Sequence, residues 1–351
     1  MGCCRDVRGA GLRLGRMSRF KSVPVAEKVD RATFENDIKP LHRPVLLKGL
    51  AAHWPVVQAA NESPEALGAY LKRFETGKGV TVSVCPPEHD GHFFYTRDLD
   101  GFNFYNVERT VSQLVDRLLD PARLSSREAL YLQAMFIDTL LPGMVAEIGM
   151  PLSPEPRARL WIGNSLYTQT HFDMSSNIAC HIAGEKVFTL FPPDQIANMY
   201  PGPLLKMPGG VPVSLASLEN PDFDAHPRFA QALEVAEEAR LEPGDAIYIP
   251  AMWWHHVHTV GRLNLLVNYW WNEARADLYP PFAGLFMAAL TLKPLPEFER
   301  TAWRKLLDYY IFELDGDPNA HMPESVPSFF RKDMPEEHMA RLKDMVRKGL
   351  A

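Results

Sequence analysis

The stretch THFDMSSNIACHIAGEK, residues 170–186, places two histidines, an aspartate and a lysine among short apolar runs. Its composition and its turn residues predict β-strands. In a strand, His171 and Asp173 leave the same face, because successive side chains alternate between the two faces. An imidazole beside a carboxylate supplies two of the three protein ligands of a non-haem Fe(II) site. An ordinary half-exposed hairpin would show the same pattern, so this stretch alone leaves both interpretations open.

A second stretch, PGDAIYIPAMWWHHVHTV at residues 243–260, offers candidates for the third ligand. A Pro-Gly-Asp turn and a predicted strand come first, and three histidines follow a break at a proline. Alternation places His256 and His258 on one face of the strand and His255 on the other, so only one face can meet the metal. H-x-D alone is a weak motif. Its combination with this second stretch favours a metal site over a solvated strand.

A metal site of this kind needs a place for a co-substrate. Three protein ligands on an octahedral iron leave three positions, which a bidentate 2-oxo acid and dioxygen can fill. The distal carboxylate of the 2-oxo acid then needs a cation. Lys186 begins the apolar run KVFTLF after a predicted Ala-Gly turn and is a candidate, although a lysine at a strand end can equally reach solvent. Thr168, Tyr131 and Asn177 are possible hydrogen-bond partners.

The rest of the chain predicts one barrel with flanking helices. Short β-type runs with turns of Gly, Pro, Asn or Asp fill residues 157–272, which is typical of an antiparallel sandwich or barrel. Residues 23–156 mix strands and helices, and we assign residues 23–275 to one catalytic domain. Residues 1–22 are rich in arginine and predict a disordered tail, with a transit peptide as the alternative. Residues 276–351 predict a C-terminal helical region.

Helix signals stand out at four places before the C-terminal region. Ser63 is a candidate N-cap for the helix that follows it, and Thr110 is one for a helix over residues 110–121. Two further helices are predicted at residues 138–149 and around residues 227–241.

The composition is that of an ordinary globular protein of 351 residues, with 46% hydrophobic and 23% charged residues. The formal net charge of −6 gives no general positive field for nucleic acid. No apolar run has the length of a membrane span. The four cysteines form no C-x-x-C pair, which fits a reducing compartment. We therefore expect a cytoplasmic protein without a nucleic-acid or membrane partner.

Two C-terminal segments are more apolar than surface helices should be. FAGLFMAALTLKPL at residues 282–295 is largely apolar, and TAWRKLLDYYIFEL at residues 301–314 is amphipathic. Part of this surface would cover the barrel, and the remainder is of the kind that marks a protein interface. A two-fold dimer is the commonest closed arrangement. We therefore expect a homodimer whose interface includes residues 301–314.

Two further motifs, LNLLVNYWW at residues 263–271 and HRPVLLKGLAAHWP at residues 42–55, complete a family pattern. With the two stretches above, they resemble the cupin-like JmjC family of Fe(II)/2-oxoglutarate dioxygenases, in particular the branch that includes the asparaginyl hydroxylase of the hypoxia-inducible factor. The resemblance covers residues 24–272. It implies a mainly β fold, a double-stranded β-helix (a jelly-roll or cupin barrel) with flanking and C-terminal helices, and dimerisation through those C-terminal helices.

The resemblance also implies roles for individual residues. His171, Asp173 and His255 match the iron ligands. His255 is preferred over His256 because the family's ligand directly follows the tryptophan. Lys186 matches the lysine that pairs with the 2-oxoglutarate carboxylate. The other matched positions are Thr168, Tyr131, Asn177 and Asn268 in the co-substrate pocket and Trp270 beside the substrate.

One departure limits what the resemblance implies. Pro212 and Val213 stand where the asparaginyl hydroxylase carries polar, substrate-contacting residues, so co-substrate use carries over and asparagine hydroxylation does not. We therefore expect a dioxygenase that hydroxylates a protein or peptide side chain, with its selectivity in the loops at residues 88–106 and 202–222. The alternatives are the same chemistry on a small molecule or nucleotide, demethylation of methyl-lysine, a metal-binding cupin without turnover and a Zn-dependent isomerase.

Overall fold

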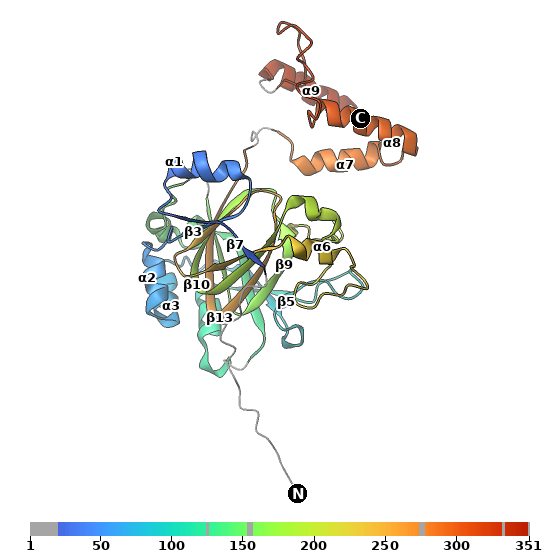
Figure 1. Ribbon diagram of the computed structural model, residues 1–351. Coiled ribbons are helices and arrows are strands. Elements are labelled where there is room, and N and C mark those ends of the chain that lie inside the picture. Colours follow the sequence, from blue (N-terminus) through green and yellow to red (C-terminus); the bar gives the residue numbers. More distant parts are fainter. Residues whose placement is uncertain (1–19, 124–125, 153–156, 274–277, 332–333, 350–351) are drawn as a thin grey trace. The chain divides into compact units, whose positions relative to one another are not determined.

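The computed structural model describes residues 20–123, 126–152, 157–273, 278–331 and 334–349 (Figure 1). Contacts divide the chain into two units, Met1–Glu273 and Ala274–Ala351. The predicted tail lies outside the described residues up to residue 19. Its last two residues, Lys21–Ser22, form a short strand.

The described residues form thirteen strands and nine α-helices. The strands are β1 (Lys21–Ser22), β2 (Val25–Glu27), β3 (Val45–Lys48), β4 (Val80–Cys85), β5 (His92–Phe93), β6 (Tyr105–Arg109), β7 (Ala129–Phe136), β8 (Ala158–Gly163), β9 (Leu166–Phe172), β10 (Ser176–Phe191), β11 (Glu237–Leu241), β12 (Ala246–Ile249) and β13 (Trp254–Trp271). The helices are α1 (Arg31–Thr33), α2 (Pro55–Glu62), α3 (Pro64–Arg73), α4 (Val111–Leu119), α5 (Ile137–Leu140), α6 (Phe229–Glu234), α7 (Pro281–Thr291), α8 (Glu297–Tyr310) and α9 (Glu336–Gly349).

The two long strands β10 and β13 organise the first unit (Figure 1). They pair with each other in antiparallel fashion from one end to the other. On its other edge, β10 pairs first with β12 and then with β11. The other edge of β13 is divided in the same way between β9 and β8. Both long strands therefore pass from one layer of the barrel into the next, which confirms the predicted double-stranded β-helix.

The long strands bend where the two layers meet. The register of β10 against β13 shifts on either side of Ala183. Gly184 follows with a φ of 85°, and a Cβ at this position would lie 1.9 Å from the side-chain oxygen of Asn264. Only glycine fits such a position. The expected turn between two strands is therefore wrong, because the chain continues through a bulge and Lys186 lies on the same strand as Asn177.

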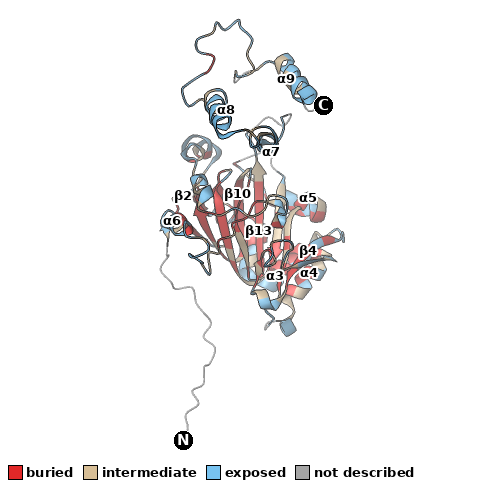
Figure 2. Cartoon of the chain, turned by 90° about the vertical axis from the view of Figure 1, so that its right-hand side faces the viewer, coloured by how far each residue is buried: buried red, intermediate tan, exposed pale blue. Residues whose placement is uncertain are grey.

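Helix α3 packs against α2 (Figure 1) and against α4 (Figure 2). Both predicted N-caps are present. The Ser63 hydroxyl accepts a hydrogen bond from the backbone N–H of Ala66 at 3.0 Å. Thr110 forms a reciprocal capping box with Gln113. The apolar faces of these helices join the same core as the inner side chains of β4, β7 and β8.

Two predicted helices are shorter than the sequence indicated. In residues 138–149, a 3-10 turn that begins at Pro142 replaces the continuation of α5, because proline lacks the N–H that the next helical turn requires. In residues 227–241, α6 gives way to β11, which pairs with β10 and contributes to the barrel core. Strand pairing overrides the helical preference of that segment.

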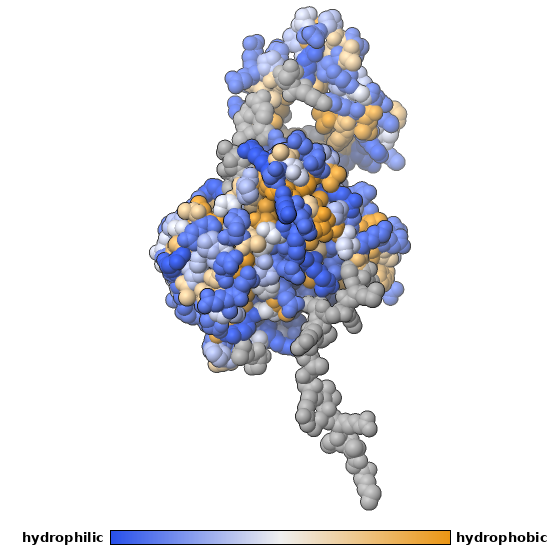
Figure 3. All heavy atoms as spheres, turned by 60° about the vertical axis from the view of Figure 1, so that its left-hand side comes forward, coloured by the Kyte–Doolittle hydropathy of each residue, from blue (hydrophilic) through white to orange (hydrophobic). Residues whose placement is uncertain are grey.

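The second unit contains α7, α8 and α9, and no described residue of these helices is buried. The predicted amphipathic helix of residues 301–314 corresponds to α8 and the turn after it. Buried residues follow the barrel strands, whereas α8 and α9 are mostly exposed (Figure 2). Apolar side chains therefore reach the surface of this unit (Figure 3). Leu290, Phe298 and Trp303 are among the exposed ones. In the described part of the chain, no helix is both long and apolar enough to cross a membrane.

Candidate metal centre

Three buried side chains meet at the end of β9. His171 lies on β9, Asp173 follows directly after it, and His255 is the register partner of His171 on β13. Their potential ligand atoms all lie within 4.8 Å of one another. The His255 Nε2 atom is 3.8 Å from an Asp173 carboxylate oxygen, and the two imidazole centroids are 4.2 Å apart. The antiparallel pairing of β9 with β13 thus brings together residues that are 84 positions apart in the chain, 171 and 255.

Backbone contacts orient both imidazoles. The Nδ1 atom of His171 donates to the carbonyl oxygen of Gln169 at 2.8 Å, and that of His255 donates to the carbonyl oxygen of Trp253 at 3.1 Å. Because Nδ1 carries the proton in each ring, the Nε2 lone pairs are free to bind a metal. Burial holds the pKa of His255 well below its usual value, which keeps this ring neutral.

The carboxylate completes the donor set. Burial raises the pKa of Asp173, and the charge of Arg159, together with that of His171 whenever this ring is protonated, offsets part of that rise. A bound cation would favour the ionised carboxylate strongly. Two neutral imidazoles and one carboxylate are the donor set that non-haem Fe(II) sites use. The residues present therefore fit the implied metal.

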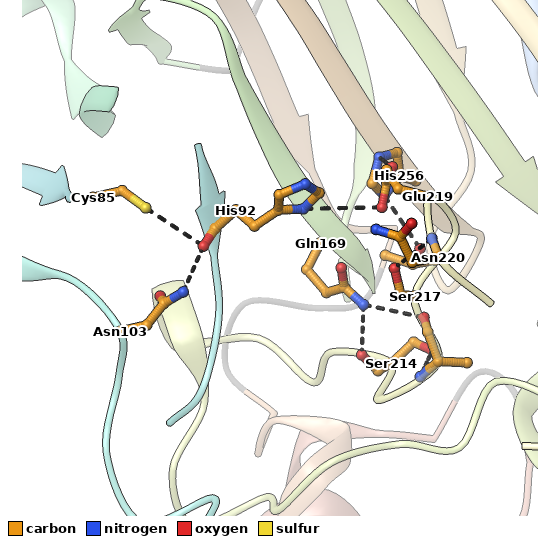
Figure 4. Close-up of polar contacts among 11 residues, drawn as sticks. Cys85, His92, Asn103, Gln169, Ser214, Ser217, Glu219, Asn220 and His256 are labelled. Atoms are coloured by element: carbon orange, nitrogen blue, oxygen red, sulfur yellow. Dashed lines mark hydrogen bonds and ion pairs between the residues drawn. The ribbon is translucent and has the colours of Figure 1, made fainter. Parts of the chain in front are cut away.

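The other two histidines of the second stretch lie elsewhere. The pairing of β13 with β9 is irregular between His255 and Val257, so strict alternation breaks there. The Nε2 atom of His256 lies 2.7 Å from one oxygen of Glu219, whose other oxygen is 4.0 Å from Nδ1 of His92 (Figure 4). The ring of His258 stacks on Tyr167 with centroids 4.3 Å apart. Neither side chain takes part in the cluster of His171, Asp173 and His255.

A cavity of about 600 Å³ is lined by two of the three residues, His171 and Asp173. Both loops that were expected to carry selectivity contribute to its wall. Phe93, Phe102 and Phe104 form an aromatic side, and the segment from Pro208 to Val213 forms another edge. Further lining residues are Thr81, Ser83, Asn106, Tyr131, Gln133, Arg159, Trp161, Thr168, Gln169 and Trp270.

The expected co-substrate residues fall into two groups. Tyr131 and Thr168 line this cavity, as does Trp270. The Thr168 hydroxyl and the Tyr131 hydroxyl are 3.5 Å apart. Asn177, Asn268 and Lys186 are buried on β10 and β13 and do not line the cavity. The Asn268 side-chain oxygen accepts a hydrogen bond from the Trp161 indole at 3.0 Å, whereas the Asn177 side-chain oxygen has no partner among the described residues.

Lys186 is a buried cation without a counter-charge. Its exposed fraction is 6%, and no carboxylate of the described residues lies within ion-pair distance of its Nζ atom. Burial lowers the pKa of Lys186 to about 7. An uncompensated ammonium in such a place is unfavourable, so an anionic ligand beside it would be stabilising. The residue therefore fits a co-substrate carboxylate.

Three polar or charged residues of this region were missed from the sequence. Gln169 donates from its amide to the backbone carbonyls of Ser214 and Ala216 at 2.9 and 3.1 Å, which fixes the insertion against β9 (Figure 4). Glu219 and Arg159 were missed as well. A charged residue inside an apolar β-run, as in ARLWIG, is the signal that could have identified Arg159, since the same signal identified Lys186.

Comparison with known proteins places the fold in a family. A lysine-specific demethylase of Arabidopsis thaliana, JMJ31, is 35% identical over 106 residues, which are 30% of this chain and 19% of that protein. The tRNA wybutosine-synthesizing protein 5 of Danio rerio is 24% identical over 80% of this chain and 84% of its own length. HSPB1-associated protein 1 of Bos taurus is 24% identical over 66% of this chain and 48% of its own length.

The chain thus spans less than half of the demethylase and of the HSPB1-associated protein, and most of the tRNA-modifying one. The sequence model of the cupin-like domain family matches residues 31–277, which include every strand from β3 to β13. This match covers more than half of the chain and contains the whole buried cluster of two histidines and an aspartate, and the chain therefore belongs to the cupin-like domain family.

Proposed function

We propose that this chain is an Fe(II)- and 2-oxoglutarate-dependent oxygenase. The observation that carries the proposal is the buried cluster of His171, Asp173 and His255 in a cupin-like barrel. The buried ammonium of Lys186 supports the proposal independently, because it has no ion-pair partner among the described residues. A metal-binding cupin without turnover does not need a cation that can bind an anionic co-substrate.

Each group of the chain then has a defined task. The Nε2 atoms of both histidines and the carboxylate of Asp173 would hold the iron, and Lys186 would hold the distal carboxylate of 2-oxoglutarate by a charge-assisted contact. Bound together, iron and 2-oxoglutarate supply the oxidation of a substrate C–H bond by dioxygen, with release of succinate and CO2. The backbone carbonyls of Gln169 and Trp253 keep the two imidazoles in the ligand tautomer. The aromatic side of the cavity, with Phe93, Phe102 and Phe104, would exclude water from the reacting groups.

The reaction we propose is hydroxylation of a protein or peptide side chain. The printed names of the relatives include a lysine demethylase and a tRNA-modifying protein, so the substrate class differs within the family. The net charge of −6 weighs against a nucleic-acid substrate. Oxidation of a small molecule or nucleotide is the alternative.

Succinate formation tests the chemistry. Purified protein with Fe(II), ascorbate and 2-oxoglutarate should release succinate, and His171→Ala should not. Peptide pools incubated with the same mixture should contain species that gain the mass of one oxygen. Metal binding without succinate formation, with or without peptides, would favour the non-catalytic cupin instead.

We also propose a cytoplasmic location. Cys85 and Cys180 are both free and buried, as expected in a reducing compartment. Microscopy of the tagged full-length chain checks this, and a signal confined to an organelle would support the transit-peptide interpretation of the arginine-rich N-terminus.

A further inference from the structure

Arg159 extends from β8 into the wall of the cavity beside the metal centre. Its register partners are Asn268 on β13 and Phe136 on β7. The guanidinium carbon lies 4.2 Å from the ring centroid of Phe136 and 4.8 Å from that of Trp270. Both contacts are to aromatic rings, which attract the cation without occupying its in-plane N–H donors.

A comparison with Arg157, two residues earlier, shows what Arg159 lacks. Arg157 lies 3.7 Å from the centroid of the same Phe136 ring. Its guanidinium is neutralised by Asp138 through two hydrogen bonds of 2.7 and 2.6 Å. Arg159 has no carboxylate of the described residues within ion-pair distance. One arginine is therefore part of a completed ion pair, and the other keeps its donors for a ligand.

Arg159 also shares its cavity with two residues of the metal centre. His171, Asp173 and Arg159 all belong to the lining of this cavity. Among the described residues that line the cavity, Arg159 is the only lysine or arginine. Because Asp173 is assigned to the metal, Arg159 is the cation of this lining that an entering anion would meet.

We propose that Arg159 binds a side-chain carboxylate of an acidic peptide substrate, on or directly beside the residue that is oxidised. This inference rests on the proposed oxygenase function. The planar guanidinium matches a carboxylate with two parallel hydrogen bonds. The co-substrate has its own candidate cation in Lys186, on β10, so Arg159 remains available for the substrate.

A peptide fits this wall better than a polynucleotide does. A nucleic acid carries one phosphate per nucleotide and is usually bound by several cations, whereas this lining offers one. The aromatic side formed by Phe93, Phe102 and Phe104 suits an apolar residue next to the acidic one. The class of substrate is therefore a segment in which an Asp or Glu adjoins an apolar side chain.

A peptide-binding selection tests the inference without turnover. Full-length protein loaded with Mn(II) and 2-oxoglutarate without oxygen is incubated with a random peptide library, and bound peptides are sequenced. The wild type should enrich Asp and Glu at one position. R159Q should lose this enrichment and bind the best peptide roughly 10- to 100-fold more weakly, as expected for lost hydrogen bonds to a charged group. R159E should select Lys or Arg at that position instead.

Two further variants control for folding and for charge in general. R157Q removes the neighbouring arginine, which stacks on the same ring and lies outside the cavity lining, and should select as the wild type does. R159K keeps the charge without the planar fork, and should retain the acidic preference at reduced affinity. Absence of acidic enrichment in the wild type, or equal enrichment by R159Q, would overturn the inference. Binding of a short oligonucleotide in preference to acidic peptides would overturn it too.

Calorimetric titration of 2-oxoglutarate separates this inference from the proposed function. If R159Q loses more affinity for 2-oxoglutarate than for the best peptide, Arg159 belongs to the co-substrate and the inference is wrong. Succinate formation by the wild type with Fe(II) is measured in parallel. Its absence would contradict the oxygenase proposal, while Arg159-dependent selection of acidic peptides would still stand as a binding result.

Discussion

His255 and His256 are consecutive residues with nearly equal burial, 4% and 1% exposed, yet they serve two different clusters. The Nδ1 atom of His255 is occupied by a backbone carbonyl, and its Nε2 atom faces Asp173. His256 is arranged the other way. Its Nε2 atom lies 2.7 Å from Glu219, and its Nδ1 atom is 3.5 Å from the Thr170 hydroxyl. One ring presents a free lone pair to a shared point, and the other has both nitrogens engaged by the protein.

The two clusters differ in where their carboxylate comes from. Asp173 follows β9 directly, so the barrel itself fixes its position beside His171. Glu219 comes from the long insertion between β10 and β11 and reaches His256 and His92 from outside the barrel (Figure 4). The same insertion supplies Val213 at the edge of the cavity. The carboxylate of Asp173, fixed by the barrel, can bind a metal, whereas the carboxylate of Glu219 holds the insertion against the barrel.

The largest expected effect separates the two adjacent histidines. His255→Ala should abolish stoichiometric Fe(II) binding and succinate formation, a loss of more than about 100-fold, since even the partners of metal ligands are worth roughly 10- to 100-fold. His256→Gln should retain metal binding within about tenfold. Metal content after gel filtration and calorimetric titration measure both. The opposite order of effects would mean that β13 is displaced by one residue, which exchanges its two faces.

A pH effect of intermediate size is expected at Lys186. Its pKa in the folded protein is about 7, against a usual value of 10.5. A carboxylate ligand binds the protonated form, so the affinity for 2-oxoglutarate should fall as pH rises above 7, by about tenfold per unit. Between the two pKa values the unfolded chain binds more protons than the folded one, so the ligand-free protein should become more stable as pH rises from 7 to 10.5.

Lys186→Met is the matched variant for that titration. It should bind 2-oxoglutarate weakly at every pH, and neither its 2-oxoglutarate affinity nor its stability should change with pH in the way described for the wild type. Its Mn(II) affinity should stay near that of the wild type. Calorimetry between pH 6 and pH 9 and thermal unfolding over the same range provide the data. A wild-type affinity that does not change above pH 7 would remove Lys186 from the co-substrate site.

A stability effect should distinguish the insertion contact from the metal centre. Glu219→Ala leaves the buried Nε2 atom of His256 without its partner, which should cost about 1–3 kcal/mol of the free energy of unfolding. Glu219→Gln keeps a polar partner and should cost less. Both variants should retain metal binding, because Glu219 is not among the clustered ligands. Chemical denaturation and metal titration are the measurements. A loss of metal binding without a loss of stability would contradict the prediction and would assign Glu219 to the metal site.

The sequence predicted what depends on neighbouring residues or on strand alternation. The caps at Ser63 and Thr110 and the pair of His171 and Asp173 are of this kind. The barrel was predicted from the short β-type runs and from the resemblance, and the choice of His255 over His256 came from the resemblance alone. The order in which the strands pair could not be deduced from local pattern, although it is what joins His255 to His171.

The missed features depend on partners far away in the chain. Glu219 contacts a histidine 37 residues later, and no local pattern indicates it. Arg159 contacts a tryptophan 111 residues later, and its only local signal is that of a charged residue inside an apolar β-run. The helix predicted at residues 227–241 was too long for the same reason, since pairing with β10 makes its last five residues a strand. The bulge at Gly184 was predicted as a turn because glycine is typical of both structures, since both require a positive φ.

The smallest effect on either cluster is expected from the C-terminal unit. No described residue of α7 or α8 is buried, although many of their side chains are apolar. The exposed fractions of Leu290, Phe298, Trp303 and Leu306 are 73%, 83%, 45% and 45%. Exposed apolar side chains in this number usually belong to an interface, and an isologous contact with a second copy of this chain covers them on both sides at once.

We propose a homodimer through α8, and sedimentation should show it at micromolar concentration. Trp303→Lys combined with Leu306→Lys should give a monomer with unchanged metal content, whereas Lys305→Glu on the same helix should remain dimeric. A wild-type monomer would contradict the proposal, and a dimer that survives the double substitution would move the interface away from α8.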